Sequence, residues 1–383
     1  MEGWAHRMMA GRRRRARDLG IPFRGITGEH NAITDVTGVA LGYCSIMTGE
    51  AIADGSPPAV HTGVTVIFPR GKTATDPVLA GSFILNGAGE CTGLHWISES
   101  GFLESPIGIT NTHSVAAVHE AIIRYQQRNG LMVGKFSLPV VAETYDGFLN
   151  DINGFHVREE HVLAAIADAN GGPLAEGNVG GGTGMSLFGW KGGSGTSSRR
   201  VASDSGTFTV AAFVQGNFGR ANEAIIAGIP VGQLLGARPK HDASAHEEPG
   251  SIIVVVAIDA PLMPHQLNRL AKRASLGVAR TGGNAGNLSG DIMLAFSTAN
   301  PGFWHATGTI STCAVLSNRT LDEFFGPVAD ATEEAIINAL VGAETMSGYQ
   351  GHTLEAIPLE PLLAVLTDHG RLDVANKPRS AGR

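Results

Sequence analysis

The segment from Ile252 to Ile258 constrains the fold more than any other part of the chain. It consists almost entirely of Val and Ile, and a continuous run of β-branched residues is typical of a strand buried on both faces. Such a strand lies inside a sheet, and further layers must cover both sides of that sheet. We therefore expect a layered fold built around this segment.

The elements expected elsewhere are consistent with such layers. Segments with strand composition are residues 64–68, 208–214 and 292–296. Helices are expected after Thr112 as a plausible N-cap, over residues 157–169 with a glycine stop, after Pro264, and over residues 332–341. Because strands and helices interleave along the chain, the sequence predicts sheets that are covered by helices.

The segment before the apolar run is very different. Residues 237–250 are polar, contain two prolines and show no periodicity, which indicates a surface loop or linker. The loop changes directly into Ser251 and the expected core strand. An ordinary domain linker is one interpretation. The other is a cleavage loop that delivers Ser251 to the first position of the strand.

Charge and composition exclude several classes of protein. The net charge of −7 argues against nucleic-acid binding, which needs a basic face. No apolar run has the length of a membrane helix, and no apolar region follows Arg12 to Arg15 as an export signal would require. We therefore predict a cytoplasmic location, a flexible basic tail over residues 1–24, and a single catalytic domain over residues 25–383.

Metal and cofactor chemistry has no support in the sequence. The 14 histidines form no HExxH motif, and Cys44, Cys91 and Cys313 form no CxxC pair. The glycine-rich segment 180–184 lacks the Lys-Ser/Thr ending of a phosphate-binding loop. We expect no metal and no cofactor, and we interpret this segment as a tight loop beside the active site.

Ser251 is the candidate nucleophile. A serine hydroxyl needs a nearby base, and a serine at a chain terminus carries one in its own α-amine, whose pKa is about 7.7–8.0. The chemistry requires a loop that can be cut, a small residue before the serine and a rigid strand after it. Pro249-Gly250-Ser251-Ile252 meets these requirements. We therefore consider self-cleavage between Gly250 and Ser251.

The chain resembles the self-processing serine peptidases of the DmpA/BapA type, the L-aminopeptidase/D-amidase-esterases and β-aminopeptidases. Residues 250–262 are similar to the start of the β chain in that family. The resemblance extends over nearly the whole chain from Gly25 to Gly370. Further similar blocks are residues 31–36, 108–112, 177–185 and 351–356.

The resemblance implies an α+β fold, a four-layer αββα sandwich of the DmpA/ornithine-acetyltransferase type. It also implies cleavage into an α chain (residues 1–250) and a β chain (residues 251–383), which stay together and assemble as a homo-oligomer of αβ pairs. The expected substrates are small peptides, amides or esters with a free amino terminus. L-, D- and β-residues all remain open as the released residue.

The resemblance also assigns roles to two residues downstream of the nucleophile. Ser289 is expected to contact Ser251, and Asp291 is expected to orient Ser289 and favour the protonated amine. On an extended segment the two side chains share a face. From the residues alone, a hydrogen-bonded turn would be the ordinary reading, since Ser, Gly and Asp are turn formers.

Three residues upstream receive roles by the same resemblance. The Asn217 amide is expected to donate to the developing oxyanion. Glu143 is expected to pair with the substrate ammonium, and Tyr145 to assist the oxyanion or shape the pocket. From the residues alone, the ordinary interpretations would be that Asn217 is a β-turn asparagine, Glu143 a surface acid and Tyr145 a half-buried tyrosine.

Two other functions fit the same fold. An acyltransferase of the ornithine-acetyltransferase type would resolve the acyl-enzyme with an amine instead of water, although those enzymes use Thr where this chain has Ser251. A binding protein without self-cleavage is the alternative outside the enzymes.

Overall fold

Two sheets form the centre of the molecule. The computed structural model describes residues 15–49, 58–236 and 249–372. One sheet has the order β1-β2-β5-β6, which are Ala40–Thr48, Val60–Phe68, Ile107–Asn111 and Val140–Thr144. The other has the order β4-β3-β12-β11-β10-β9, which are Phe102–Leu103, Val78–Gly87, Leu288–Ser297, Pro249–Ile258, Gly206–Asn217 and Gly193–Ser203.

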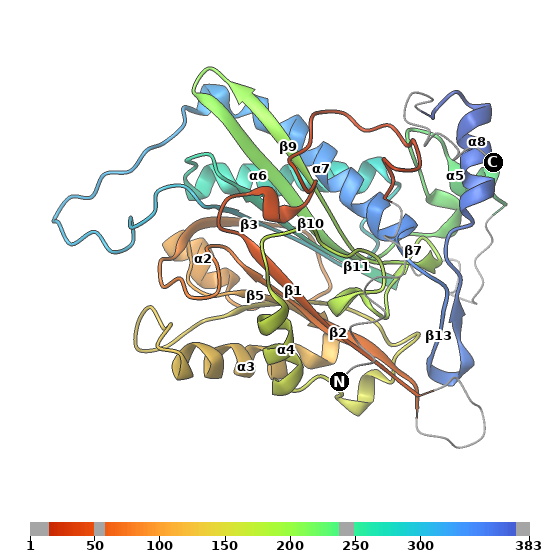
Figure 1. The fold of residues 1–383 in the computed structure, drawn as a ribbon, viewed down its shortest axis with the longest axis horizontal. Helices are drawn as coiled ribbons and strands as arrows, with labels where there is room; N and C mark the ends of the chain where they lie inside the picture. Colours follow the sequence, from red (N-terminus) through yellow and green to blue (C-terminus); the bar gives the residue numbers. More distant parts are fainter. Residues whose placement is uncertain (1–14, 50–57, 237–248, 373–383) are drawn as a thin grey trace, which may run out of the picture.

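Helices cover the outer face of each sheet (Figure 1). α3 (Val115–Arg128) and α4 (Glu159–Asp168) pack on the four-stranded sheet, whereas α6 (Pro264–Arg280) and α7 (Asp322–Val341) pack on the six-stranded sheet. The predicted four-layer αββα sandwich is therefore confirmed. Its layers run from α6 and α7 at the top of Figure 1, through the two sheets, to α3 and α4 at the bottom.

Shorter elements complete the described chain. The helices are α2 (Leu94–Ser100), α5 (Val231–Leu234) and α8 (Leu359–Asp368), and the strands are β7 (Ser186–Leu187), β8 (Trp190–Lys191), β13 (Met346–Ser347) and β14 (Thr353–Leu354). 3₁₀ helices span Ile33–Asp35, Thr112–Ser114, Ile152–Gly154, Gly180–Gly182, Ala221–Glu223, Asn318–Thr320 and Tyr349–Gly351. Among the described residues, every helix is too short or too polar to cross a bilayer.

β11 is buried on both faces, as its composition predicts. Ile252, Val254, Val256 and Ile258 pack in the cluster that contains α6 and α7. Ile253, Val255 and Ala257 pack in the cluster between the two sheets. Successive side chains of a strand point to opposite faces, so one apolar segment serves two cores. This double burial places the start of β11 deep in the molecule.

The other predicted strands are also present, and each is longer than predicted. Residues 64–68, 208–214 and 292–296 lie in β2, β10 and β12. The structure differs at α7, which begins at Asp322 although the prediction started at Thr332. This helix contains Pro327, and an interior proline usually indicates a helix boundary. Burial of the helix against the sheet outweighs that local preference.

Two local predictions around the candidate site are wrong. Thr112 does not cap α3, because a 3₁₀ turn spans Thr112–Ser114 and the α-helix begins at Val115. Ser251 is the third residue of β11, not the first, because ladder hydrogen bonds begin at Pro249. The last two residues of the loop predicted over residues 237–250 therefore belong to the strand. Residues 237–248 lie outside the described residues.

The predicted tail over residues 1–24 also needs correction for residues 15–24. Ala16, Leu19 and Ile21 are buried. The Arg15 guanidinium lies 2.7 Å from the buried Glu176 carboxylate, and that of Arg17 lies 2.8 Å from the buried Glu334. The sequence shows a basic segment, but only the fold brings these carboxylates to it.

We predict that Arg15→Met destabilises the protein more at about pH 8 than at about pH 5. Burial raises the pKa of Glu176 to about 7, and Arg15 opposes this increase. Without Arg15 the folded-state pKa rises further, so the folded state holds a proton that the unfolded state releases, and stability falls as pH rises. We expect a loss of roughly 3 kcal/mol at the higher pH, measured by urea unfolding.

Arg24→Met is the matched control, because Arg24 lies in the same segment and is exposed. It should change the free energy of unfolding by less than about 0.5 kcal/mol. An Arg15→Met loss that is equal at both pH values would contradict the role of Glu176.

Candidate active site

Three neighbouring strands place the candidate nucleophile between two backbone partners. Ser251 of β11 lies opposite Asn217 of β10 in an antiparallel ladder and opposite Gly290 of β12 in a parallel ladder. The Gly290 N–H donates a hydrogen bond to Ser251 Oγ at 3.1 Å. The Ser251 side chain is almost fully buried. The hydroxyl is therefore held in one direction by its neighbours before any substrate binds.

Gly250, the residue before the nucleophile, has no room for a side chain. A Cβ atom at this position would lie 2.5 Å from the Asn217 carbonyl oxygen and 2.7 Å from Phe218 Cα. Both are backbone atoms, which cannot move aside as the end of a flexible side chain could. The sequence pattern called for a small residue here, and the packing explains why glycine fits.

Ser289 and Asp291 share a face of β12, as predicted. The Ser289 hydroxyl donates to Asp291 Oδ1 at 2.9 Å, and both residues are buried. In the parallel ladder Ser289 lies opposite Gly250, one position before Ser251. The hydrogen bond that reaches the Ser251 hydroxyl comes from the backbone of Gly290, not from the Ser289 hydroxyl that the resemblance suggested. In the ladder Ser289 thus lies beside the Gly250–Ser251 peptide bond, where a new terminus would form.

Asn217 is oriented by a backbone donor outside its strand. Its Oδ1 accepts a hydrogen bond from the Ser186 N–H at 2.8 Å. Because the oxygen of the amide is engaged on this side, the Nδ2 donor of the same group is directed away from Ser186. This arrangement suits a side chain that donates to developing negative charge.

Glu143 is a second buried acid of the site, on the other sheet. Its carboxylate accepts hydrogen bonds from the Thr112 hydroxyl and, at 2.9 Å, from the Glu90 N–H. Burial raises the pKa of Glu143, and these two donors partly oppose the increase. A carboxylate of this kind is costly to bury alone and gains most from a cationic partner such as an ammonium group.

Gly89 connects Glu143 with the strand beside the nucleophile. A Cβ atom on Gly89 would lie 3.1 Å from Glu143 Oε1 and 3.0 Å from Gly290 Cα. Glu143 belongs to the four-stranded sheet, whereas Gly290 belongs to the six-stranded sheet. The two sheets therefore approach each other across this glycine, with the acid on one side and the donor to Ser251 Oγ on the other.

Tyr145 differs from the other predicted residues. It follows the end of β6 and is 50% exposed, and its ring lies close to the backbone of Gly147. Within the described residues its hydroxyl makes no hydrogen bond. The structure thus brings Asn217, Ser251, Ser289 and Asp291 together and places Glu143 across Gly89, but it leaves Tyr145 at the surface.

Several contacts of this site were not predicted from the sequence. Gly89, Glu90, Ser186 and Gly290 act through backbone atoms or through the absence of a side chain, which residue identity does not reveal. Thr112 was predicted only as a helix cap. The glycine pair in Asn86-Gly87-Ala88-Gly89-Glu90 was the available signal, since closely spaced glycines indicate close backbone approach.

Cys44 and Cys91 are poor candidates for a competing nucleophile. Burial raises the pKa of the Cys91 thiol to about 12 and also raises the pKa of Cys44, so both stay as thiols near neutral pH. Within residues 15–49, 58–236 and 249–372, no three potential metal ligands form a group.

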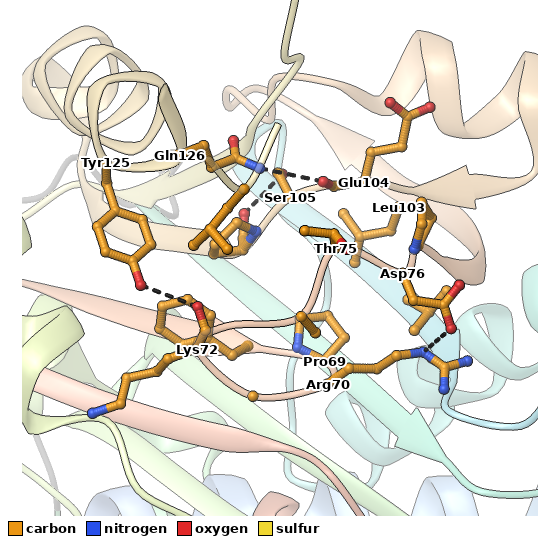
Figure 2. A pocket seen from close by; sticks show the side chains of 17 residues that line it. Pro69, Arg70, Lys72, Thr75, Asp76, Leu103, Glu104, Ser105, Tyr125 and Gln126 are labelled. Atoms are coloured by element: carbon orange, nitrogen blue, oxygen red, sulfur yellow. Dashed lines mark hydrogen bonds and ion pairs between the residues drawn. The ribbon is translucent and has the colours of Figure 1, made fainter. Parts of the chain in front are cut away.

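A separate small cavity lies at the other end of the four-stranded sheet (Figure 2). It is lined by residues around Arg70, Asp76 and Ser105, where β2 has ended and β5 has not yet begun. Glu143 lies at the opposite end, beside the last residues of β5. The volume within reach of a water molecule is about 40 Å³, enough for very few waters. The cavity is not part of the candidate active site.

Comparison with known proteins identifies the family. The sequence profile of peptidase family S58 matches residues 31–354, which is most of the chain. The chain belongs to peptidase family S58. Its curated relatives include β-peptidyl aminopeptidase BapA of Sphingosinicella microcystinivorans, 48% identical over 372 residues and covering 94% of each chain. BapA of Sphingosinicella xenopeptidilytica is 44% identical over 367 residues, 92% of this chain and 90% of the relative.

Solved structures of S58-like proteins share the fold. The L-aminopeptidase D-Ala-esterase/amidase of Ochrobactrum anthropi, described as a prototype of the serine aminopeptidases with a variant Ntn-hydrolase fold, has a TM-score of 0.86 and 45% identity, with coverage of 94% and 99%. A Burkholderia sp. β-aminopeptidase has a TM-score of 0.84 and 44% identity, with coverage of 93% and 99%. The predicted resemblance, the DmpA-type fold and the aminopeptidase class are confirmed.

We predict that Gly89→Ala lowers kcat/KM by roughly tenfold to a hundredfold, since displacements of about 1 Å can cost that much. The added methyl group would contact both the Glu143 carboxylate and Gly290 and push them apart. Gly87→Ala is the matched control, because its Cβ would meet Ile84 at an ordinary 3.7 Å. The check is steady-state hydrolysis of an aminoacyl p-nitroanilide. Equal activity of the two variants would show that the contact at Gly89 has no role in the site.

Proposed function

We propose that this S58 family member cleaves itself between Gly250 and Ser251 and then acts as an aminopeptidase through Ser251. The observation that carries the proposal is the row formed by Asn217, Ser251 and Gly290 on adjacent strands. It combines a hydroxyl nucleophile, a side-chain donor for an oxyanion and a rigid backbone. The domain of residues 25–383 would then consist of an α chain ending at Gly250 and a β chain starting at Ser251.

The first stage creates the catalytic base. Ser251 Oγ attacks the Gly250 carbonyl carbon, the peptide C–N bond breaks, and the Ser251 nitrogen leaves as an amine. Water then hydrolyses the resulting ester, which gives the Gly250 carboxylate and restores the Ser251 hydroxyl. The close packing of Gly250 against the Asn217 carbonyl and Phe218 supports this step, since it limits the conformations open to the scissile bond.

The second stage uses the new α-amine of Ser251 as a general base for its own hydroxyl. The hydroxyl attacks the substrate carbonyl to form an acyl-enzyme, and the Asn217 amide donates to the oxyanion. The leaving amine takes the proton, and water then releases the N-terminal residue as a free acid. Ser289 and Asp291, beside the Gly250–Ser251 junction, would accept hydrogen bonds from the protonated amine.

Glu143 would select substrates with a free amino terminus. Its buried carboxylate gains a charge partner when a substrate ammonium binds, and a blocked amine would leave it without one. Tyr145, at the surface beside this acid, would line the entrance. We further propose homo-oligomers of αβ pairs, and the cytoplasmic location stays a prediction.

We propose that the enzyme releases β-amino acids in preference to L- or D-residues. Both curated relatives are β-peptidyl aminopeptidases, whereas the structural relative of Ochrobactrum anthropi is an L-aminopeptidase and D-Ala-esterase/amidase. A panel of L-, D- and β-aminoacyl p-nitroanilides with free and acetylated amines would rank these classes for the present enzyme.

The first prediction of this mechanism concerns chain cleavage. The wild-type protein should separate into two bands on denaturing electrophoresis, and N-terminal sequencing of the smaller chain should begin at Ser251. Ser251→Ala should remain whole at 39.8 kDa and show no hydrolysis, because it lacks the attacking oxygen. Ser275→Ala, on the outer helix α6, serves as the control and should behave as wild type. An active wild-type enzyme that stays at full length would refute the mechanism.

The second prediction concerns the pH dependence that Glu143 imposes. Only the ionised acid binds an ammonium group, so kcat/KM should fall as pH falls through the pKa of Glu143. Because burial raises this pKa, the fall should begin above the ordinary carboxyl pKa of about 4.3. The Ser251 amine must be neutral to act as a base, so wild type and variant share the fall in kcat/KM that its protonation causes. Glu143→Gln should lose only the additional fall that Glu143 imposes at lower pH, and should lower kcat/KM by about tenfold to a hundredfold, the worth of a charged hydrogen bond.

The matched control for this variant is Glu104→Gln, whose acid lies at the cavity of Figure 2 and not at the active site. Its profile should match wild type. If Glu143→Gln retains the additional fall at lower pH, below that of the Ser251 amine, another group titrates there, and the proposed contact with the ammonium is wrong.

A further inference from the structure

Lys191 is a fully buried lysine close to the candidate oxyanion donor. It lies in β8, which pairs with β7 in a short hairpin that runs from Ser186 to Lys191. Its Nζ donates to two backbone carbonyls, Met185 O at 2.8 Å and Gly192 O at 2.8 Å. Lysine is almost never fully buried unless its amino group is satisfied. These two carbonyl groups at the base of the hairpin compensate for part of the cost of burial.

The Met185 carbonyl and the Ser186 N–H belong to the same peptide group. Lys191 holds the oxygen end of this planar unit at 2.8 Å, and the N–H end donates to Asn217 Oδ1 at 2.8 Å. Because the peptide is rigid and planar, fixing its oxygen also fixes the direction of its N–H. Hydrogen bonds in series also polarise one another, by an estimated 10–30% per bond.

We propose that Lys191 is a positioning residue for the oxyanion donor Asn217. It acts through the Met185–Ser186 peptide, which orients the Asn217 amide so that Nδ2 faces the reacting carbonyl. This inference rests on the function proposed above, in which Asn217 stabilises the oxyanion. Lys191 touches neither substrate nor reacting atoms in this scheme, so its effect must pass through Asn217.

Other contacts hold the hairpin independently of Lys191. The Gly192 N–H also donates to Met185 O at 2.9 Å, and the Phe188 N–H donates to Phe218 O at 2.8 Å. The Thr144 hydroxyl donates to Met185 Sδ at 3.0 Å, which connects the hairpin with the four-stranded sheet. Loss of the Lys191 amino group should therefore leave the hairpin in place, with the Met185 oxygen held by the Gly192 N–H alone, and the Met185–Ser186 peptide can then tilt about that single hydrogen bond.

The test is Lys191→Met, which keeps the length of the side chain and removes its donors. We expect kcat to fall by about tenfold to a hundredfold, less than the 10²–10³-fold cost of deleting an oxyanion donor, with KM changed by less than about twofold. Rates are expressed per Ser251-terminated chain, so that slow self-cleavage does not count as slow turnover. Lys72→Met is the matched control, because Lys72 Nζ also donates to a carbonyl, Ala167 O, but lies at the remote cavity in Figure 2.

Two further measurements separate positioning from a purely structural role. In an Asn217→Ala background, Lys191→Met should reduce kcat by less than about twofold, because the group it orients is absent. An aminoacyl aldehyde, which forms an oxyanion on Ser251, should bind Lys191→Met more weakly by the same factor as the loss in kcat. The released amino acid, which forms none, should bind as it does to wild type.

Three outcomes would overturn the proposal. They are unchanged kcat in Lys191→Met, an equal loss of activity with and without Asn217, and equal weakening of the aldehyde and the amino acid. If Lys191→Met does not fold, Lys191→Leu, which also lacks N–H donors, replaces it in the same assays. If both fail to fold, Lys191 serves folding and the proposal is wrong. A wild-type enzyme that neither cleaves itself nor hydrolyses substrate would instead refute the proposed function.

Discussion

The hydrogen-bond ladders on the two sides of β11 set the position of the groups in the candidate site. An antiparallel register aligns Asn217 with Ser251, and a parallel register aligns Gly290 with Ser251. A slip by one residue in either ladder would turn the side chains of that strand to the opposite face. The apolar residues after Ser251 prevent such a slip, because Ile252 and Ile253 belong to cores on different sides of the sheet.

Glycine allows this arrangement to be compact. At Gly250, Gly89 and Gly290 an added Cβ would lie within about 3 Å of backbone atoms from another segment. Gly89 and Gly290 face each other, so the loop after β3 approaches β12 as closely as two backbones allow. The high glycine content, 52 of 383 residues, is thus used where layers meet and where the acid Glu143 comes near the nucleophile strand.

Buried charges are satisfied by the fold in two different ways. Glu176 and Glu334 receive arginines from the segment that precedes the first sheet, and Arg199 adds a third, fully buried arginine at 2.7 Å from Glu334. Glu143 receives only neutral donors, the Thr112 hydroxyl and the Glu90 N–H. Burial raises the pKa of Glu143, and these two neutral donors only partly oppose the increase. The two structural acids have arginine partners within the fold, whereas Glu143 is the acid for which we propose a cationic partner from the substrate.

The sequence by itself determined that helices cover the sheets, that β11 is buried on both faces and that Ser289 and Asp291 share a face, because these follow from the periodicity of side chains along helices and strands. It also indicated Gly250-Ser251 as a possible cleavage site. Only the tertiary structure decided that Ser251 is third in its strand, that residues 15–24 are packed against buried carboxylates, and that Thr112 contacts Glu143 instead of capping a helix. It also decided that the Ser186 N–H orients Asn217 and that Tyr145 lies at the surface. The reason is physical: each of these depends on backbone groups or carboxylates from distant segments, and the identity of one residue does not encode which distant atoms the fold brings within hydrogen-bonding distance.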